Sequence, residues 1–167
     1  MRHKKALFWP LALTLVLADC ATKQLAVERL SPAYVPHSVV GEVVRFTLAY
    51  NPGAAFSFHV GPYSRWVFSA LAVGTLVVLG MAYWRAPVTD TRRVLALALV
   101  AGGALGNLLD RLRSPQGVVD FIDLGVGDVR FYTFNLADVG VSVGAALLAV
   151  VLWQDEAEAE RRAAGGS

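Results

Sequence analysis

Four long apolar stretches constrain this chain more than any other feature of its sequence. They cover approximately residues 6–25, 64–84, 94–109 and 136–153. A helix needs about 20 mostly apolar residues to cross the hydrocarbon core of a bilayer. Hydrophobic residues make up 56% of the 167 residues and charged residues 17%, and a protein of this size has too little interior to bury so much apolar surface. The sequence therefore predicts one integral membrane domain, residues 1–167, with four transmembrane helices.

The third stretch is short and rich in glycine. Gly102, Gly103 and Gly106 lie one helical turn or less apart. Small residues at such spacing let the backbones of two membrane helices come close together. We therefore expect a neighbouring helix to pack tightly against this stretch.

Basic residues in the short flanking segments predict the orientation of the spans. The N-terminal tail and the loop between the second and third spans carry Arg2, Lys4, Lys5, Arg85, Arg92 and Arg93. Such residues favour the cytoplasmic side, so we expect both termini, including the charged tail 154–167, in the cytoplasm. Residues 30–63 and 111–134 then lie outside, although these two segments also contain arginines.

The two outer segments carry strand and turn signals. Residues 39–48 are rich in β-branched side chains around Gly41, which predicts a small extracytoplasmic hairpin or sheet. The second outer segment has turn signals at residues 114–117 and 125–127. The expected fold class is an all-α membrane protein: four transmembrane helices with a small extracytoplasmic β-sheet and an outer loop/helix segment.

The first twenty residues mimic a bacterial lipoprotein signal peptide. They begin with basic residues, continue with an apolar run and end in Leu17-Ala18-Asp19-Cys20. Asp19 stands where a small uncharged residue belongs, and three further spans follow. We therefore expect a retained anchor in which Cys20 is a packing residue.

Composition excludes several other classes of protein. The chain has a single cysteine and three histidines without ligand spacing, so neither an internal disulfide nor a metal site is expected. A net charge of +2 is too small to indicate a nucleic-acid-binding protein. The sequence predicts no cofactor, no metal and no nucleic-acid partner.

Three aspartates in separate spans are expected at one depth. At a rise of about 1.5 Å per residue, Asp19 lies roughly 21 Å from the cytoplasmic edge and Asp110 and Asp138 roughly 25 Å. Ionisable residues inside a span are costly and are functional candidates by default. Three carboxylates near the outer boundary of the bilayer indicate a polar site.

Local spacing supports such a site. Side chains three or four residues apart share a helix face. The pairs with this spacing are Asp19 with Lys23, Asn107 with Asp110, and Asn135 with Asp138. Asp120 and Asp123 precede the fourth span, and we expect them to fold back over Asp138.

Several chemistries remain compatible with these residues. The polar groups would form hydrogen bonds that hold the helices together, or they would form the site of a small transporter or lipid-binding protein. They would also suit Mg²⁺ ligands of a membrane phosphotransferase. A serine mechanism lacks a recognisable nucleophile motif. The remaining alternative is a pair of carboxylates that share one proton and together activate water against an amide.

Five short motifs follow one another between Asp19 and Asp138. They are Asp19-Cys20-Ala21-Thr22-Lys23, Asn51-Pro52-Gly53-Ala54-Ala55-Phe56-Ser57, Gly102-Gly103-Ala104-Leu105-Gly106-Asn107-Leu108-Leu109-Asp110-Arg111, Val118-Val119-Asp120-Phe121-Ile122 and Phe134-Asn135-Leu136-Ala137-Asp138. Together, and in this order, they resemble the motifs of the lipoprotein signal peptidases, also called signal peptidase II. Cys20 departs from the family, where a glutamine is common, and the charged tail lies outside the resemblance.

The resemblance implies an activity and a location. It implies an aspartic endopeptidase with Asp120 and Asp138 as the catalytic dyad and without a cofactor or metal. The implied substrates are diacylglyceryl-modified prolipoproteins, cleaved on the amino side of the lipidated cysteine to release the signal peptide. We expect a monomer in contact with membrane lipid, in the bacterial cytoplasmic membrane, with the active site near the outer face.

The other matching positions are expected to support the dyad or bind substrate. They are Asp19, Lys23, Asn51, Gly53, Ala54, Phe56, Asn107, Asp110, Arg111 and Asn135. Asn107 and Asn135 would orient the dyad or the substrate backbone, and Asp110 and Arg111 would form a structural or substrate-positioning pair. The small residues after Asn51 would let a loop approach the substrate, while Phe56 would pack on lipid or peptide.

Overall fold

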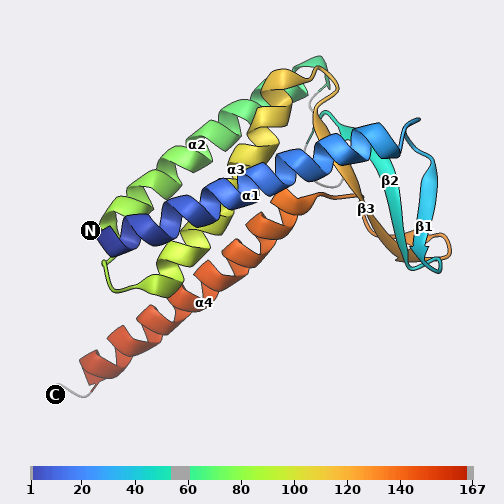
Figure 1. Cartoon of the computed structure of the whole chain (residues 1–167). Helices are drawn as coiled ribbons and strands as arrows, with labels where there is room; N and C mark the ends of the chain where they lie inside the picture. Colours follow the sequence, from blue (N-terminus) through green and yellow to red (C-terminus); the bar gives the residue numbers. More distant parts are fainter. Residues whose placement is uncertain (1, 54–60, 165–167) are drawn as a thin grey trace.

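The computed structural model describes residues 2–53 and 61–164. Its four long helices are α1 (Arg2–Arg29), α2 (Ser64–Arg85), α3 (Thr91–Arg113) and α4 (Leu136–Ala164), and the short 3-10 helix η2 (Gly61–Tyr63) precedes α2. Figure 1 shows both termini at one end of the bundle and a small sheet at the other. We call these the terminal end and the sheet end.

The expected helices are all present within the described residues. Four helices are long and apolar enough to cross a membrane. Each helix extends past its apolar stretch, and α4 continues through the charged tail to Ala164, because Ala, Glu and Arg are strong helix formers. In α3, 50% of the most apolar window is buried inside the protein, against 17–22% in the other three helices. The short third stretch is therefore the central helix of the bundle.

Glycines on α3 permit close helix packing, as predicted. A Cβ atom on Gly102 would lie 3.0 Å from the carbonyl oxygen of Ala12 in α1. One on Gly103 would collide with the carbonyl oxygen of Ala137 in α4, and one on Gly106 would lie 2.6 Å from a carboxylate oxygen of Asp19. Both neighbouring helices thus approach α3 more closely than a side chain would allow.

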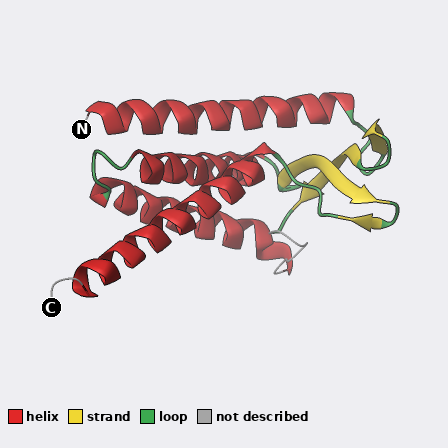
Figure 2. Cartoon of the chain, turned by 90° about the horizontal axis from the view of Figure 1, so that it is seen from below, coloured by secondary structure: helices red, strands yellow, loops and turns green. Residues whose placement is uncertain are grey.

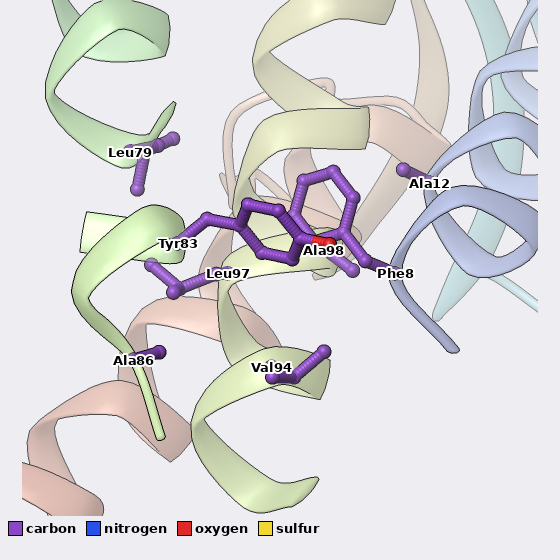
Figure 3. Packing of buried hydrophobic residues seen from close by; sticks show 8 residues of the cluster. All are labelled: Phe8, Ala12, Leu79, Tyr83, Ala86, Val94, Leu97 and Ala98. Atoms are coloured by element: carbon purple, nitrogen blue, oxygen red, sulfur yellow. The ribbon is translucent and has the colours of Figure 1, made fainter. Parts of the chain in front are cut away.

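An apolar cluster near the terminal end joins α1, α2 and α3. Its buried members are Phe8, Ala12, Leu79, Tyr83, Ala86, Val94, Leu97 and Ala98 (Figure 3). The rings of Phe8 and Tyr83 lie 4.4 Å apart between centroids. The Lys4 ammonium lies over the Tyr83 ring and donates to the carbonyl oxygen of Ala86 at 2.9 Å, which satisfies the C-terminal end of α2.

The strands form one antiparallel arrangement in the order β1-β2-β3-β4 (Figure 2). Their bounds are β1 (Pro36–Val40), β2 (Val44–Asn51), β3 (Val118–Val126) and β4 (Val129–Arg130). The predicted hairpin is β1 with β2, and Gly41 adopts a φ of +52° in its turn, a conformation that glycine favours. The fold class is confirmed: four apolar helices with a small sheet.

The second outer segment differs from its expected loop or helix character. Residues 118–126 form a strand that pairs along β2 from Val44 opposite Leu124 to Asn51 opposite Val118. The partner strand lies about 70 residues earlier in the chain, so local sequence does not reveal the pairing. The predicted turns are present on either side of β3, with positive φ angles at Gly117 and Gly127.

Candidate active site

A buried lysine stands at the centre of an ionic cluster between α1 and α3. Lys23 Nζ lies 2.7 Å from Asp19 Oδ2, 2.9 Å from Asp110 Oδ2 and 2.8 Å from Asn107 Oδ1. An ammonium group only donates hydrogen bonds; Lys23 donates one to Asn107 and forms ion pairs with the two carboxylates. Lys23 is 3% exposed and Asp19 is fully buried. The predicted pair of Asp19 with Lys23 is confirmed, and Asp110 completes it from a second helix.

Asp138 is placed by the hydrogen bonds that begin α4. The side chain of Asn135 accepts from the Asp138 backbone N–H at 2.9 Å, and the Asp138 carboxylate accepts from the Asn135 N–H at 3.2 Å. This reciprocal pair is a capping box. Asp19 Oδ1 accepts a hydrogen bond at 2.9 Å from the backbone N–H of Ala137, in the first turn of α4. The carboxylate of Asp138 consequently stands in the first turn of α4, where the helix dipole stabilises negative charge.

Asp120 reaches the same region from β3. Its side chain is 3% exposed and accepts hydrogen bonds from Asn135 Nδ2 at 2.7 Å and from Asn51 Nδ2 at 3.3 Å. Burial, followed by the negative charge of Asp138, raises the pKa of Asp120 to about 7. The hydrogen bonds from the two asparagines act in the opposite direction and are outweighed.

Two asparagines connect these carboxylates. Asn107 Nδ2 donates to Asp138 Oδ1 at 2.7 Å, and Asn107 Oδ1 accepts from both Lys23 and Asn135. Because a lysine ammonium only donates, Lys23 determines which end of the Asn107 amide faces it. Asn135 in turn donates to Asp120. One continuous network therefore runs from the Lys23 cluster to both Asp138 and Asp120.

A pocket of about 820 Å³ opens beside this network. Its polar lining includes Asn51, Asn107, Arg111, Asp120 and Asp138. Its apolar wall includes Tyr34, Phe131, Tyr132, Phe134, Val139, Val141 and Val143. A mostly apolar concavity with a few convergent polar groups is the usual form of a binding site.

Arg111 and Asp110 do not pair with each other as expected. Arg111 donates to the carbonyl oxygen of Gly53 at 2.8 Å and to that of Asn107 at 3.2 Å. Asp110 contacts Lys23 and accepts from the Val119 N–H at 3.1 Å. Consecutive side chains on a helix point in different directions, so the two residues secure different elements: Arg111 the segment after β2, and Asp110 the start of β3.

The remaining predicted residues divide into three groups. Asn51 and Gly53 lie at the pocket, and the Gly53 N–H donates to Asn51 Oδ1 at 3.0 Å. Ala54 and Phe56 lie outside the described residues. Asp123 does not lie over Asp138, because residues three apart in a strand face opposite sides.

Asp123 instead belongs to an ionic cluster on the other face of the sheet. Its carboxylate lies 2.7 Å from Arg130 Nη2 and accepts from Thr47 Oγ1 at 3.1 Å.

The sequence analysis did not predict the apolar wall of the pocket. The spacing of Val139 and Val143, one helical turn apart near Asp138, is the only local signal for it.

The fold and this site define a class of protein: a four-helix membrane protein with two carboxylates, buried Asp120 on β3 and partly buried Asp138 on α4, beside a pocket at one end of its bundle. A sequence profile described as Signal peptidase (SPase) II matches residues 11–154. The chain therefore belongs to the signal peptidase II family and is a multi-pass bacterial membrane protein. The resemblance carried by the five motifs is confirmed.

Individual relatives and solved structures agree with this assignment. The chain is 41% identical over 148 residues to the lipoprotein signal peptidase of Hydrogenovibrio crunogenus, covering 84% of this chain and 81% of that protein. It is 50% identical over 102 residues to the lipoprotein signal peptidase of Escherichia coli K12, covering 60% of this chain and 62% of that protein. A bacterial membrane enzyme solved by the in meso method at 2.3 Å superposes with a TM-score of 0.75 and 27% identity, covering 89% of this chain and 88% of the other.

Proposed function

We propose that this chain is an aspartic endopeptidase that removes the signal peptide from diacylglyceryl-modified prolipoproteins, cleaving on the amino side of the lipidated cysteine. Family membership supports the reaction and the substrate class. One structural observation supports the aspartic mechanism. Asp120 and Asp138 line the same pocket and are joined through Asn135, although they come from different elements.

The surroundings of the two carboxyl groups suggest different roles. Asp138 lies in the first turn of α4 and accepts from Asn107 and from a backbone amide, which suits a negatively charged general base. The pKa of Asp120 is about 7 because the group is buried near that charge, which suits a general acid. We therefore assign Asp120 as the general acid, because its raised pKa favours the protonated form, and Asp138 as the general base.

The reaction then proceeds in two steps. Asp138 takes a proton from a water molecule as its oxygen bonds to the scissile carbonyl carbon, and protonated Asp120 donates its proton to the carbonyl oxygen. In the second step the oxygen returns its proton to Asp120, the carbonyl re-forms, and the C–N bond breaks. The proton held by Asp138 passes to the leaving amine, so each aspartate ends as it began.

The pocket suits a lipid-linked substrate. Its apolar wall would receive apolar side chains of the signal peptide, while the diacylglycerol remains in lipid and the scissile amide reaches Asp120 and Asp138. Arg111 holds the segment after β2 against this pocket through the Gly53 carbonyl. With both termini in the cytoplasm, as the basic residues predict, the site lies near the outer face of the membrane.

Comparison of a lipidated and an unlipidated substrate tests this function. The purified chain is incubated in detergent with a diacylglyceryl-modified prolipoprotein and with the same protein before lipidation, and the products are identified by mass spectrometry. We expect cleavage only of the lipidated form, with the modified cysteine as the new N-terminal residue. Intact lipidated substrate, or equal cleavage of both forms, would contradict the proposed specificity.

A further inference from the structure

Ser142 is the only residue with a hydroxyl group in the apolar stretch 136–153 of α4. It follows Asp138 by four residues, so the two side chains lie on one face of the helix, about one turn apart. Ser142 lines the same pocket as Asp138, between Val139 and Val143 on the wall that α4 provides. This apolar wall therefore contains one hydroxyl group, at a defined distance from a proposed catalytic aspartate.

The packing of α4 turns Ser142 away from the rest of the bundle. A Cβ atom on Gly140 would collide with the Leu15 side chain of α1, and one on Gly144 would lie 2.8 Å from the Ala96 carbonyl oxygen of α3. These two glycines identify the face of α4 that packs against its neighbours. Ser142 lies two residues from each, which is about 160° around a helix of 3.6 residues per turn. Its side chain is exposed.

The Ser142 hydroxyl has no hydrogen-bond partner within the part of the chain that the structure describes. A helical serine commonly donates to the carbonyl oxygen four residues earlier, as Ser69 does to Arg65 at 2.7 Å. Thr14 and Thr75 also lack such a bond, but neither lines the pocket. An unpaired hydroxyl in apolar surroundings is unfavourable, so Ser142 is free to bond a molecule that occupies the pocket.

The proposed function supplies a molecule that needs such a bond. Cleavage requires an extended stretch of substrate backbone beside Asp120 and Asp138. An extended stretch leaves N–H and C=O groups that a helix would pair internally, and unpaired groups of this kind are costly in the hydrocarbon of a bilayer. A polar group of the enzyme beside this stretch therefore favours the bound state. The inference rests on the proposed function in this respect.

Ser142 lies on the signal-peptide side of the scissile bond. Signal peptides begin with a basic segment, and basic segments favour the cytoplasm, so the chain before the scissile bond runs back into the membrane. The helix α4 also runs from the sheet end toward the terminal end (Figure 1). Four helical residues cover about 6 Å, and an extended chain advances about 3.3 Å per residue. Ser142 is therefore level with the peptide bond two residues before the scissile one.

We propose that Ser142 is a positioning residue that hydrogen-bonds the substrate backbone at the peptide bond between the third and second residues before the lipidated cysteine. A serine hydroxyl can donate to the carbonyl oxygen of this bond or accept from its N–H. The apolar side chains of the signal peptide then contact Val139 and Val143. Ser142 acts by fixing the depth of the substrate backbone relative to Asp120 and Asp138.

Replacement of one backbone amide in the substrate tests this contact. The full chain in detergent is given two synthetic diacylglyceryl-modified peptides, in which an amide or an ester links the third and second residues before the cysteine. The ester has no N–H, and its carbonyl oxygen is a weaker acceptor. Wild type is compared with Ser142→Ala and with the isosteric pair Ser142→Thr and Ser142→Val. Ser69→Ala, which changes a helical serine outside the pocket, is the matched control.

We expect Ser142→Ala to raise KM for the amide peptide about 3–10-fold with kcat nearly unchanged, because the lost hydrogen bond is present in both the ground state and the transition state. The ester should raise KM of wild type by a similar factor and that of Ser142→Ala much less. Ser142→Thr and Ser69→Ala should resemble wild type. Ser142→Val should resemble Ser142→Ala, and it gives the same reading if the alanine variant does not fold.

Two results would overturn this proposal while leaving the proposed function intact. One is a wild-type KM in both Ser142→Ala and Ser142→Val. The other is an ester effect of the same size in wild type and in these variants, which would show that the hydroxyl and the peptide bond do not interact. Failure of the wild-type chain to cleave the amide peptide would overturn the proposed function, and this proposal with it.

Discussion

Replacement of Lys23 by methionine tests whether the buried ionic cluster holds the bundle together. Methionine keeps most of the apolar stem but removes the ammonium group. Asp19, which is fully buried, and Asp110, which is 14% exposed, then face each other without a cation between them. Removing one partner of a buried ion pair typically costs about 3–5 kcal/mol, because the remaining charge is buried without compensation. We expect Lys23→Met to lower the free energy of unfolding by this amount.

A double-mutant cycle separates the lost ion pair from other effects. Asp19→Asn alone should cost less, about 1–3 kcal/mol, since Lys23 retains Asp110 and Asn107 as partners. The double variant should be more stable than the sum of the single losses predicts, by about 0.5–3 kcal/mol. The coupling is favourable because the second substitution removes the carboxylate that the first left unpaired.

The assay is equilibrium unfolding in detergent micelles, followed by the fluorescence of the four tryptophans. Gln24→Met is the matched control, because Gln24 is the exposed neighbour of Lys23 and its side chain donates to Glu28 on the surface of α1. It should change stability by less than about 0.5 kcal/mol. A Lys23→Met protein within about 1 kcal/mol of wild type, or strictly additive losses, would refute this account of the cluster.

Three further outcomes follow from the site and the packing. Since the pKa of Asp120 is raised to about 7 and its protonated form is the proposed acid, cleavage should weaken as pH rises through 7, and a pH–rate profile that climbs there would contradict the assignment. Gly103→Ala should cost about 1–3 kcal/mol, because its Cβ would collide with the Ala137 carbonyl. Gly74→Ala, with open space around the Cβ, should be neutral or stabilise by up to about 1 kcal/mol, and equal unfolding temperatures for both alanine variants would count against the packing argument. Cys20→Ser and addition of EDTA should each leave turnover unchanged; loss of activity on chelation would favour a metal-dependent reaction.

Much of the fold could be predicted because the bilayer simplifies the problem. Apolar length alone locates four spans, and glycine spacing on residues 102–106 identifies the face where helices meet. The pairing of Asp19 with Lys23 follows from helical periodicity. In each of these cases the signal and its partner lie within a few residues or on a face that must be apolar.

The strand pairing and the hydrogen bonds and ion pairs of the site depend on partner residues far apart in the sequence. The strand 118–126 pairs with β2, and nothing near Asp120 in the sequence reveals that partner. Depth arithmetic places Asp110 and Asp138 at one level, but it does not show that Lys23 satisfies Asp110 or that Asn107 bridges to Asp138. The capping box at residues 135–138 is different, because its Asn-x-x-Asp pattern is a local signal.

The most direct test of the central claim measures cleavage by Asp120→Asn and Asp138→Asn proteins. Asparagine keeps the size of aspartate but carries no exchangeable carboxyl proton and no negative charge. Wild-type and variant proteins are purified, shown to unfold at similar temperatures, and incubated with a diacylglyceryl-modified prolipoprotein. Each single variant should lose at least about 10²–10⁴-fold in turnover, and the double variant should be scarcely slower than either, because the two carboxyl groups act as a unit. Substantial cleavage by either folded single variant would contradict the claim that Asp120 and Asp138 carry the protons of this reaction.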